Sequence, residues 1–233
     1  MTQTSALAQR RLWVTAGCLA LGYVVLTFAG VVFQYTLQLG QSQSEGVKQL
    51  VQTSLTRNYV GGYIEYVAAL VLLVGMLLFA RLLRGETETT GWLSSCMSGA
   101  AIANVAVTIA SAAAGAAALY GAHHGASLTT ATTVNNVRNF AFFLSGGLTG
   151  VFMISAAAAG RVTGLLPRWV SYTGIAVGAF SILAVMGARI GLQNVSIMLW
   201  FAWLVALSVV ALRSGGRATY AAGGSMVRVP ATV

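Results

Sequence analysis

Long runs of hydrophobic residues recur along the chain, separated by shorter polar or charged stretches. Each run has about 20 residues or more, enough for an α-helix rising about 1.5 Å per residue to cross a hydrocarbon core about 30 Å thick. We therefore expect an all-α fold, a polytopic transmembrane helical bundle made of one domain, residues 1–212. The pattern predicts six spans, at about residues 12–33, 62–83, 92–120, 139–160, 168–188 and 192–212.

The composition agrees with a membrane address. Of 233 residues, 57% are hydrophobic and 7% are charged, whereas an ordinary soluble domain has about 25% charged residues. Twelve of the thirteen basic residues are arginine, and alanine, glycine and valine are abundant, which is typical of proteins from GC-rich bacteria. We expect a multi-pass protein of the bacterial plasma (inner) membrane, with membrane lipids as its immediate partners.

The net charge of +9 bears on orientation rather than on nucleic acid. The basic residues lie at the ends of the hydrophobic runs and form no basic stripe, so we expect no nucleic-acid partner. If both termini are cytoplasmic, nine basic residues lie inside and four outside, as the positive-inside rule favours. The four outside would be Lys48, Arg57, Arg138 and Arg189.

Two segments outside the spans have their own patterns. In the loop at about 34–61, apolar residues at helical spacing follow Ser44, a possible N-cap, and predict a short external amphipathic helix between the first two spans. The segment 213–233 contains four glycines and three arginines and shows no helical pattern, so we expect a disordered basic cytoplasmic tail.

The stretch "GRVTGLLPRWVSY" at 160–172 predicts a turn between the fourth and fifth spans. Arg161 and Arg168 would hold this turn in the cytoplasm. Pro167 suits the first turn of a helix, and Trp169 suits the headgroup level. We interpret the turn as a structural device that fixes topology.

Glu65 is the acidic residue that lies within a hydrophobic run, about three residues inside the second span. An ionised carboxylate is costly in hydrocarbon, so its side chain should face the bundle interior and be paired or protonated. Partners would come from the outer arginines Arg57, Arg138 and Arg189. Asn139, Gln193 and Asn194 would lie nearby. The cluster either binds a carboxylate or phosphate group or serves only as a structural ion pair.

Chemistry that needs a metal, a cofactor or a catalytic group finds little support. His123 and His124 are adjacent at an outer turn, and Cys18 and Cys96 are single and far apart. The chain has no aspartate, four glutamates and no recognisable catalytic motif. We expect no metal and no cofactor, assign no catalytic residue, and do not expect an enzyme.

Small residues four apart, such as Gly146 with Gly150 and Gly174 with Gly178, let helix backbones approach closely. Packing within the bundle is the favoured interpretation, and a homo-oligomer or a membrane protein partner is the alternative.

Two segments, 57–84 and 138–178, carry a family resemblance. The early Glu65, the Arg138 and Phe140 opening of the fourth span, and the turn ending in Pro167, Arg168 and Trp169 resemble a bacterial family of six-span membrane proteins known only as a domain of unknown function. The sixth span opens with Gln193 and Asn194, where such relatives often have an acidic residue. The resemblance implies a fold and a membrane address but no activity.

Two functional hypotheses remain. The first is a binding or transport module that accepts a small anionic or amphipathic, lipid-like molecule in an outward-facing polar cavity. The second is a non-catalytic accessory or scaffold subunit of a membrane complex.

Overall fold

The computed structural model describes residues 3–33, 52, 54–187 and 191–223 of the chain. Within these residues every regular element is a helix, which confirms the expected all-α class. The helices are α1 (Gln3–Phe33), α3 (Leu55–Leu82), α4 (Glu88–His123), α5 (Leu128–Thr163), α6 (Arg168–Ala184) and α7 (Leu192–Gly223).

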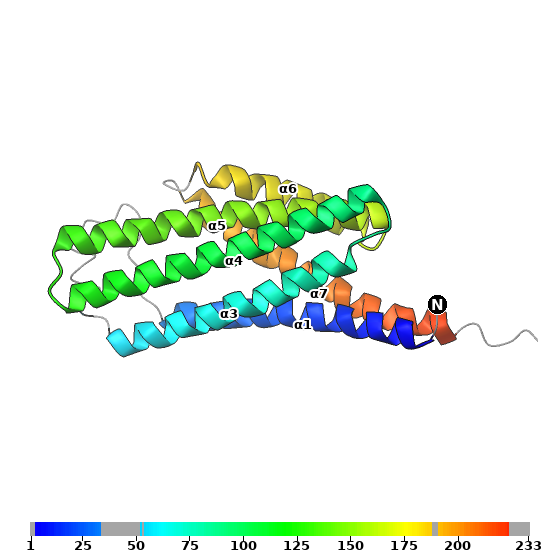
Figure 1. Ribbon diagram of the computed structural model, residues 1–233, viewed down its shortest axis with the longest axis horizontal. Helices are drawn as coiled ribbons and strands as arrows, with labels where there is room; N and C mark the ends of the chain where they lie inside the picture. Colours follow the sequence, from blue (N-terminus) through cyan, green and yellow to red (C-terminus); the bar gives the residue numbers. More distant parts are fainter. Residues whose placement is uncertain (1–2, 34–51, 53, 188–190, 224–233) are drawn as a thin grey trace, which may run out of the picture.

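The chain runs back and forth along the length of the bundle (Figure 1). Helices α1, α4 and α6 run in one direction and α3, α5 and α7 in the other. The described chain therefore starts and finishes at the same end, which we call the termini end. The opposite end, where α4 is connected to α5, we call the α4–α5 end. Each helix packs against its neighbour in sequence, and α1 also packs against α7, which closes the helices into a ring.

Five of the helices, α1, α3, α4, α5 and α7, are long and apolar enough to cross a membrane. Helix α6 has 17 residues and is shorter than these. Exposed aromatic side chains lie near both ends of α4, where Trp92 is 66% and Tyr120 is 53% exposed. Their 28-residue separation along α4 corresponds to about 42 Å, the thickness of a bilayer with its headgroups. These features indicate a multi-pass membrane protein.

Three helix boundaries differ from those expected. Helix α5 begins at Leu128 instead of 139, because Ser127 caps its first turn, and residues 128–138, with four threonines and two asparagines, are helical without forming an apolar run. Helix α3 begins at Leu55, within the expected loop, after the Ser54 cap. Helix α7 continues to Gly223, so residues 213–223 are helical where a disordered tail was expected. Glycines weaken a helix by about 1 kcal/mol each without necessarily ending it.

Part of the expected architecture lies outside the described residues. This applies to residues 47–51 and 53 of the expected external amphipathic helix, which include Lys48. It also applies to Arg189 and to residues 224–233 of the tail.

The turn between α5 and α6 is present where the sequence predicts it. Gly164 adopts φ 69°, a left-handed conformation that favours glycine, and the Leu166 N–H donates to the Gly160 carbonyl at 3.2 Å. Pro167 is the N-cap of α6, one residue before the helical position expected for it. The Arg161 guanidinium lies 4.6 Å from the centre of the Tyr172 ring. Trp169 and Arg168 are exposed.

The interior of the bundle differs between its two halves. The main hydrophobic cluster lies toward the termini end: its buried members begin at Leu72 in α3 and at Phe152 in α5, and they stop at Ala101 in α4. The polar side chains buried in this half are serines and threonines. The interior toward the α4–α5 end, which we call the polar half, is lined by more numerous buried polar side chains, which include every buried asparagine and glutamine among the described residues. They are Asn58, Asn104, Ser111, Asn135, Asn139, Ser145, Thr149, Ser181, Gln193 and Ser196.

Close helix contacts use the glycines singled out in the sequence. A Cβ atom added to Gly150 of α5 would lie 2.5 Å from the Gly178 carbonyl oxygen of α6. One added to Gly178 would lie 2.7 Å from the Gly150 carbonyl oxygen. The two backbones therefore touch inside the chain, and these glycines do not form a free surface for a partner.

Candidate functional site

Glu65 enters the polar half from α3 and lies against a glycine of α1. Its side chain is partly buried, and a Cβ atom added to Gly30 would lie 2.9 Å from the Glu65 Cγ. The missing side chain at Gly30 thus provides the space in which the glutamate side chain lies.

Arg138 enters the polar half from α5 and lies against a glycine of α4. A Cβ atom added to Gly115 would lie 2.6 Å from the Arg138 Cδ and 2.7 Å from its Nε. The backbone beneath the arginine is fixed by Ser111, whose hydroxyl donates to the Arg138 carbonyl at 2.8 Å. The Arg138 Nη1 donates to the Asn139 Oδ1 at 3.4 Å, at the long limit of a hydrogen bond.

The two charged side chains act on each other across the interior. The Glu65 carboxylate is close enough to the Arg138 guanidinium for the opposite charges to attract. The same carboxylate acts on Tyr23 of α1, whose side chain hydrogen-bonds with Trp200 of α7 and Thr27. Glu65 of α3 therefore interacts electrostatically with Arg138 of α5 and with Tyr23 of α1, and Tyr23 in turn interacts with Trp200 of α7.

A second polar layer lies deeper than Arg138, toward the hydrophobic core. The Asn104 Nδ2 of α4 donates to the Ser145 carbonyl at 2.7 Å and to the Thr149 hydroxyl at 2.8 Å. On the other side of the bundle, the Ser196 hydroxyl of α7 donates to the Ser181 hydroxyl of α6 at 2.8 Å. These bonds join α4 to α5 and α6 to α7.

Gln193 belongs to this second layer but differs from its other members. It is 1% exposed, and its side chain lies against Gly146 of α5, where an added Cβ atom would collide with Nε2. Neither its Nε2 nor its Oε1 has a hydrogen-bond partner among the described residues. Such orphaned amides are rare in protein interiors.

The structure thus brings together three of the five predicted site residues: Glu65, Arg138 and Asn139. Arg57 is exposed and its Nη2 donates to the Val32 carbonyl at 2.7 Å, so it joins the start of α3 to the end of α1. Arg189 lies outside the described residues. The four residues predicted for the structural turn, Arg161, Pro167, Arg168 and Trp169, lie at the opposite end of the bundle.

Sequence reasoning did not connect the glycines Gly30, Gly115 and Gly146 with polar side chains, nor did it single out Tyr23. The glycine spacing indicates close helix contact, but it does not tell which side chain of another helix fills the space. A tyrosine inside an apolar run carries no distinguishing signal.

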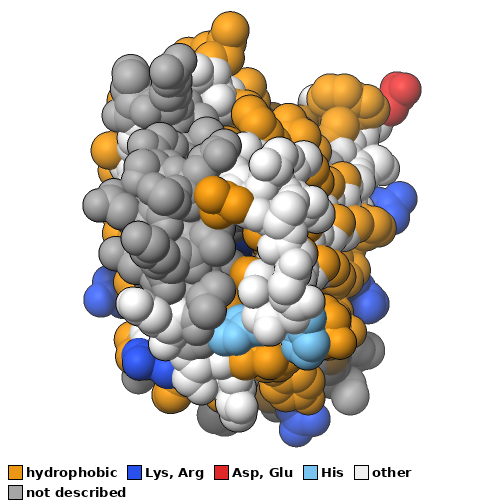
Figure 2. Space-filling view, turned by 90° about the vertical axis from the view of Figure 1, so that its left-hand side faces the viewer, with side chains coloured by type: hydrophobic (Ala, Val, Ile, Leu, Met, Phe, Trp, Pro, Cys, Tyr) orange, Lys and Arg blue, Asp and Glu red, His pale blue; other side chains and the backbone are white. Residues whose placement is uncertain are grey.

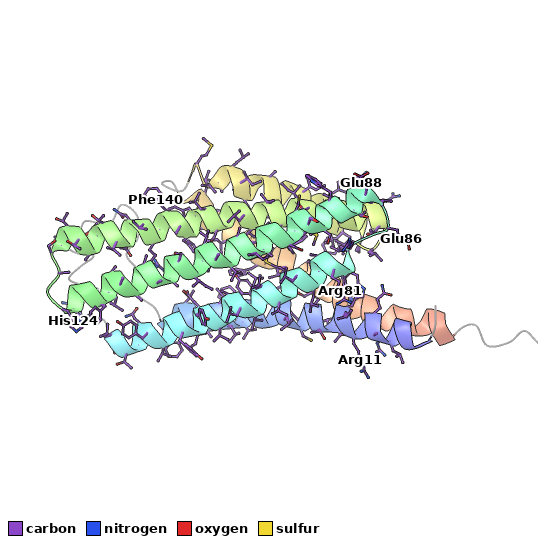
Figure 3. All side chains as sticks on the ribbon, viewed as in Figure 1. Arg11, Arg81, Glu86, Glu88, His124 and Phe140 are labelled. Atoms are coloured by element: carbon purple, nitrogen blue, oxygen red, sulfur yellow. The ribbon has the colours of Figure 1, made fainter. Side chains whose placement is uncertain are left out.

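The Arg and Glu side chains labelled in Figure 3 lie toward the termini end of the molecule. Arg11, Arg81, Glu86 and Glu88 are labelled near the termini end, and His124 is labelled at the α4–α5 end. Figure 2 looks onto the α4–α5 end, where the described surface is mostly hydrophobic or uncharged polar and includes the histidines. The His124 ring stacks on Tyr120 with centroids 3.9 Å apart. No group of three potential metal ligands occurs among the described residues.

Comparison of the chain with protein-family models, curated proteins and solved structures found no match. The family resemblance therefore stays a prediction, and the candidate site is defined by its own geometry.

Proposed function

We propose that the protein is a six-span bacterial inner-membrane protein whose polar half binds a small anionic or amphipathic molecule, for storage or for transport. The observation that carries the proposal is that Arg138, Glu65 and all the buried amide side chains of the described residues lie in one half of the bundle, whereas the other half buries only serines and threonines as polar groups. Polar and ionisable groups at membrane depth are costly and usually mark a ligand or ion pathway.

Six crossings follow from the helix directions. Helices α5 and α7 are both apolar enough to cross a membrane and both begin at the α4–α5 end (Figure 1). If both cross, the chain must cross back between them, and α6 is the helix that makes this return. Its 17 residues give a length of about 26 Å, close to the hydrocarbon thickness.

Charge supports an orientation with both termini in the cytoplasm. Among residues with described side chains, seven arginines belong to the termini end: Arg10, Arg11, Arg81, Arg84, Arg161, Arg168 and Arg213. Arg57 and Arg138 belong to the other half. By the positive-inside rule, the polar half would then lie in the outer leaflet.

An anion is the favoured ligand because of the charge balance in the polar half. Among the described residues of this half, Arg57 at the surface and Arg138 in the interior carry two positive charges against the single negative charge of Glu65. An arginine guanidinium binds carboxylate and phosphate groups through paired hydrogen bonds. The alternative, an accessory subunit of a membrane complex, loses one of its supports, because Gly150 and Gly178 pack against each other inside the chain.

The test is to extract the protein together with its surrounding lipid and to identify by native mass spectrometry what stays bound. Wild type is compared with Arg138→Gln and with Arg84→Gln, the same change at an exposed position of the termini end. We expect a retained anionic molecule that is reduced at least tenfold in Arg138→Gln and unchanged in Arg84→Gln, as loss of a charge-assisted contact predicts. Equal retention by all three proteins would contradict the proposal.

A further inference from the structure

We infer that Gln193 is a ligand-binding residue, and that the molecule accepted by the polar half carries a hydroxyl or amide group in addition to its anionic group. The inference rests on the proposed function and names the ligand class more closely.

The first step is that the amide of Gln193 is both buried and unpaired. At 1% exposure, it has no hydrogen-bond partner for either polar atom among the described residues. Leaving a buried polar group unpaired is costly, because the group loses its hydrogen bonds to water and gains none in the protein. Asn104, Ser181 and Ser196, in the same polar layer, all have partners, so Gln193 is the exception among them.

The second step is that nothing in the local packing requires an amide there. Gln193 lies against Gly146, which offers no side-chain group to bond with. A leucine of similar volume would fill the same space without a desolvation cost. The amide is therefore better explained by a group that arrives from elsewhere.

Gln193 lies at nearly the same depth in the bundle as Glu65. Gly17 of α1 touches Ser208 of α7, with an added Cβ atom 3.1 Å from the Ser208 carbonyl oxygen. The two helices are antiparallel, so Gly30, thirteen residues after Gly17, lies level with Val195, thirteen residues before Ser208. Glu65 lies against Gly30, and Gln193 is two residues from Val195. The two side chains therefore enter the interior at nearly the same depth from α3 and α7.

The chemistry of these groups defines the ligand. A glutamine amide donates through its nitrogen and accepts through its oxygen, so it matches a hydroxyl or another amide. The carboxylate of Glu65 at the same depth accepts a hydrogen bond from such a group. Arg138 lies eight residues before Gly146 on α5, about 12 Å along the helix axis. Its guanidinium would therefore hold the anion nearer the α4–α5 end. A phosphate or carboxylate with a hydroxyl group a few bonds away fits this order.

The experiment places the protein in nanodiscs of phosphatidylcholine and measures the binding of paired probes. The lipid pair is phosphatidylglycerol, whose headgroup has alcohol hydroxyls, and phosphatidic acid, whose headgroup has no alcohol hydroxyl. The soluble pair is glycerol 3-phosphate and inorganic phosphate. The pair that binds tells whether the shared chemistry comes from a lipid headgroup or from a free solute.

We expect wild type to prefer the hydroxyl-bearing member of one pair by about tenfold, the value of one well-buried hydrogen bond. Gln193→Leu should bind both members equally, whereas Gln52→Leu, the same change at an exposed position, should keep the preference. The unfolding temperature of Gln193→Leu should not fall, because no hydrogen bond is lost. Should that variant fail to fold, Gln193→Met provides the same test.

Two results would overturn the inference. If Gln193→Leu keeps the preference, or if wild type binds both members of each pair equally tightly, Gln193 contributes nothing to recognition and its amide holds at most a buried water. If neither pair binds wild type more tightly than Arg138→Gln, the proposed function fails and the inference fails with it.

Discussion

At the scale of single residues, the polar half is built from pairs in which a polar side chain lies against a glycine of another helix. Glu65 lies on Gly30, Arg138 on Gly115, and Gln193 on Gly146. Removing a β-carbon opens space between tightly packed helices and lets a long polar side chain lie along a neighbouring backbone. The glycines therefore help to determine where the charged and amide groups of the site are held.

The pair of Gly115 and Arg138 gives a direct prediction. Gly115→Ala should lower the free energy of unfolding by about 1–3 kcal/mol and displace the guanidinium, because the added methyl would overlap the Arg138 Cδ and Nε. Gly99→Ala on the same helix meets nothing within 4 Å and should stabilise by about 0.5–1 kcal/mol. Thermal unfolding in the same detergent compares the two variants. Equal changes in unfolding temperature for the two variants would contradict the contact between Gly115 and Arg138.

The sequence predicts the charged residues of the site more directly than the amide, since it places Gln193 only near the predicted polar cluster. A glutamate within a hydrophobic run must be placed inside the bundle, and an arginine at the outer end of the fourth span is a natural partner, so Glu65 and Arg138 were accessible to reasoning. Gln193 lies at the start of a span, where a polar residue is ordinary. Its importance comes from burial without a partner, which only the packing of α5 against α7 reveals.

At the scale of helices, the crossing of α5 and α6 is the closest backbone contact that the small-residue pattern indicated. Because Gly150 and Gly178 face each other, Gly150→Ala should destabilise the fold by several kcal/mol. Gly147→Ala, one residue along α5, meets only the Val185 side chain at 3.3 Å and should be much better tolerated. The check is the fraction of each variant that stays monodisperse after extraction, together with its unfolding temperature.

A different outcome at this crossing would have a clear meaning. If Gly150→Ala were as stable as wild type but lost a co-purifying membrane protein, the face would serve a partner, as the accessory-subunit hypothesis requires. The contact between the two glycine backbones would then be wrong.

Helix boundaries show which parts of the elements a hydropathy pattern can find. It located the apolar stretches of the five helices that are long and apolar enough to cross a membrane, because a segment that lies in hydrocarbon must be apolar. It missed residues 128–138 of α5, whose threonines and asparagines extend the helix beyond the apolar run. Two of these residues, Ala131 and Asn135, are buried, so tertiary contacts with neighbouring helices support this extension.

At the scale of the whole molecule, the bundle divides into a hydrophobic half that holds the helices together and a polar half in which we place the proposed ligand site. Phe79, Met97 and Phe152 are 0–1% exposed and belong to the first. Trp200, at the border, packs against Phe152 and hydrogen-bonds with Tyr23, so it connects the two. This division predicts that water and small solutes reach the interior from one side of the membrane only.

The most direct measurement of this central claim is cysteine labelling in intact cells with a small membrane-impermeant thiol reagent. In a background where Cys18 and Cys96 are replaced by alanine, Ser111→Cys and Ser94→Cys form a matched pair. Both serines are buried on α4 and donate to a carbonyl of a neighbouring helix, Ser111 in the polar half and Ser94 near the termini end.

We expect Ser111→Cys to react with the reagent from outside the cell and the ligand to slow this reaction. Ser94→Cys should stay unlabelled. If Ser111→Cys does not react while Ser94→Cys does, the polar half does not open to the outside, and the proposed site and orientation are both wrong.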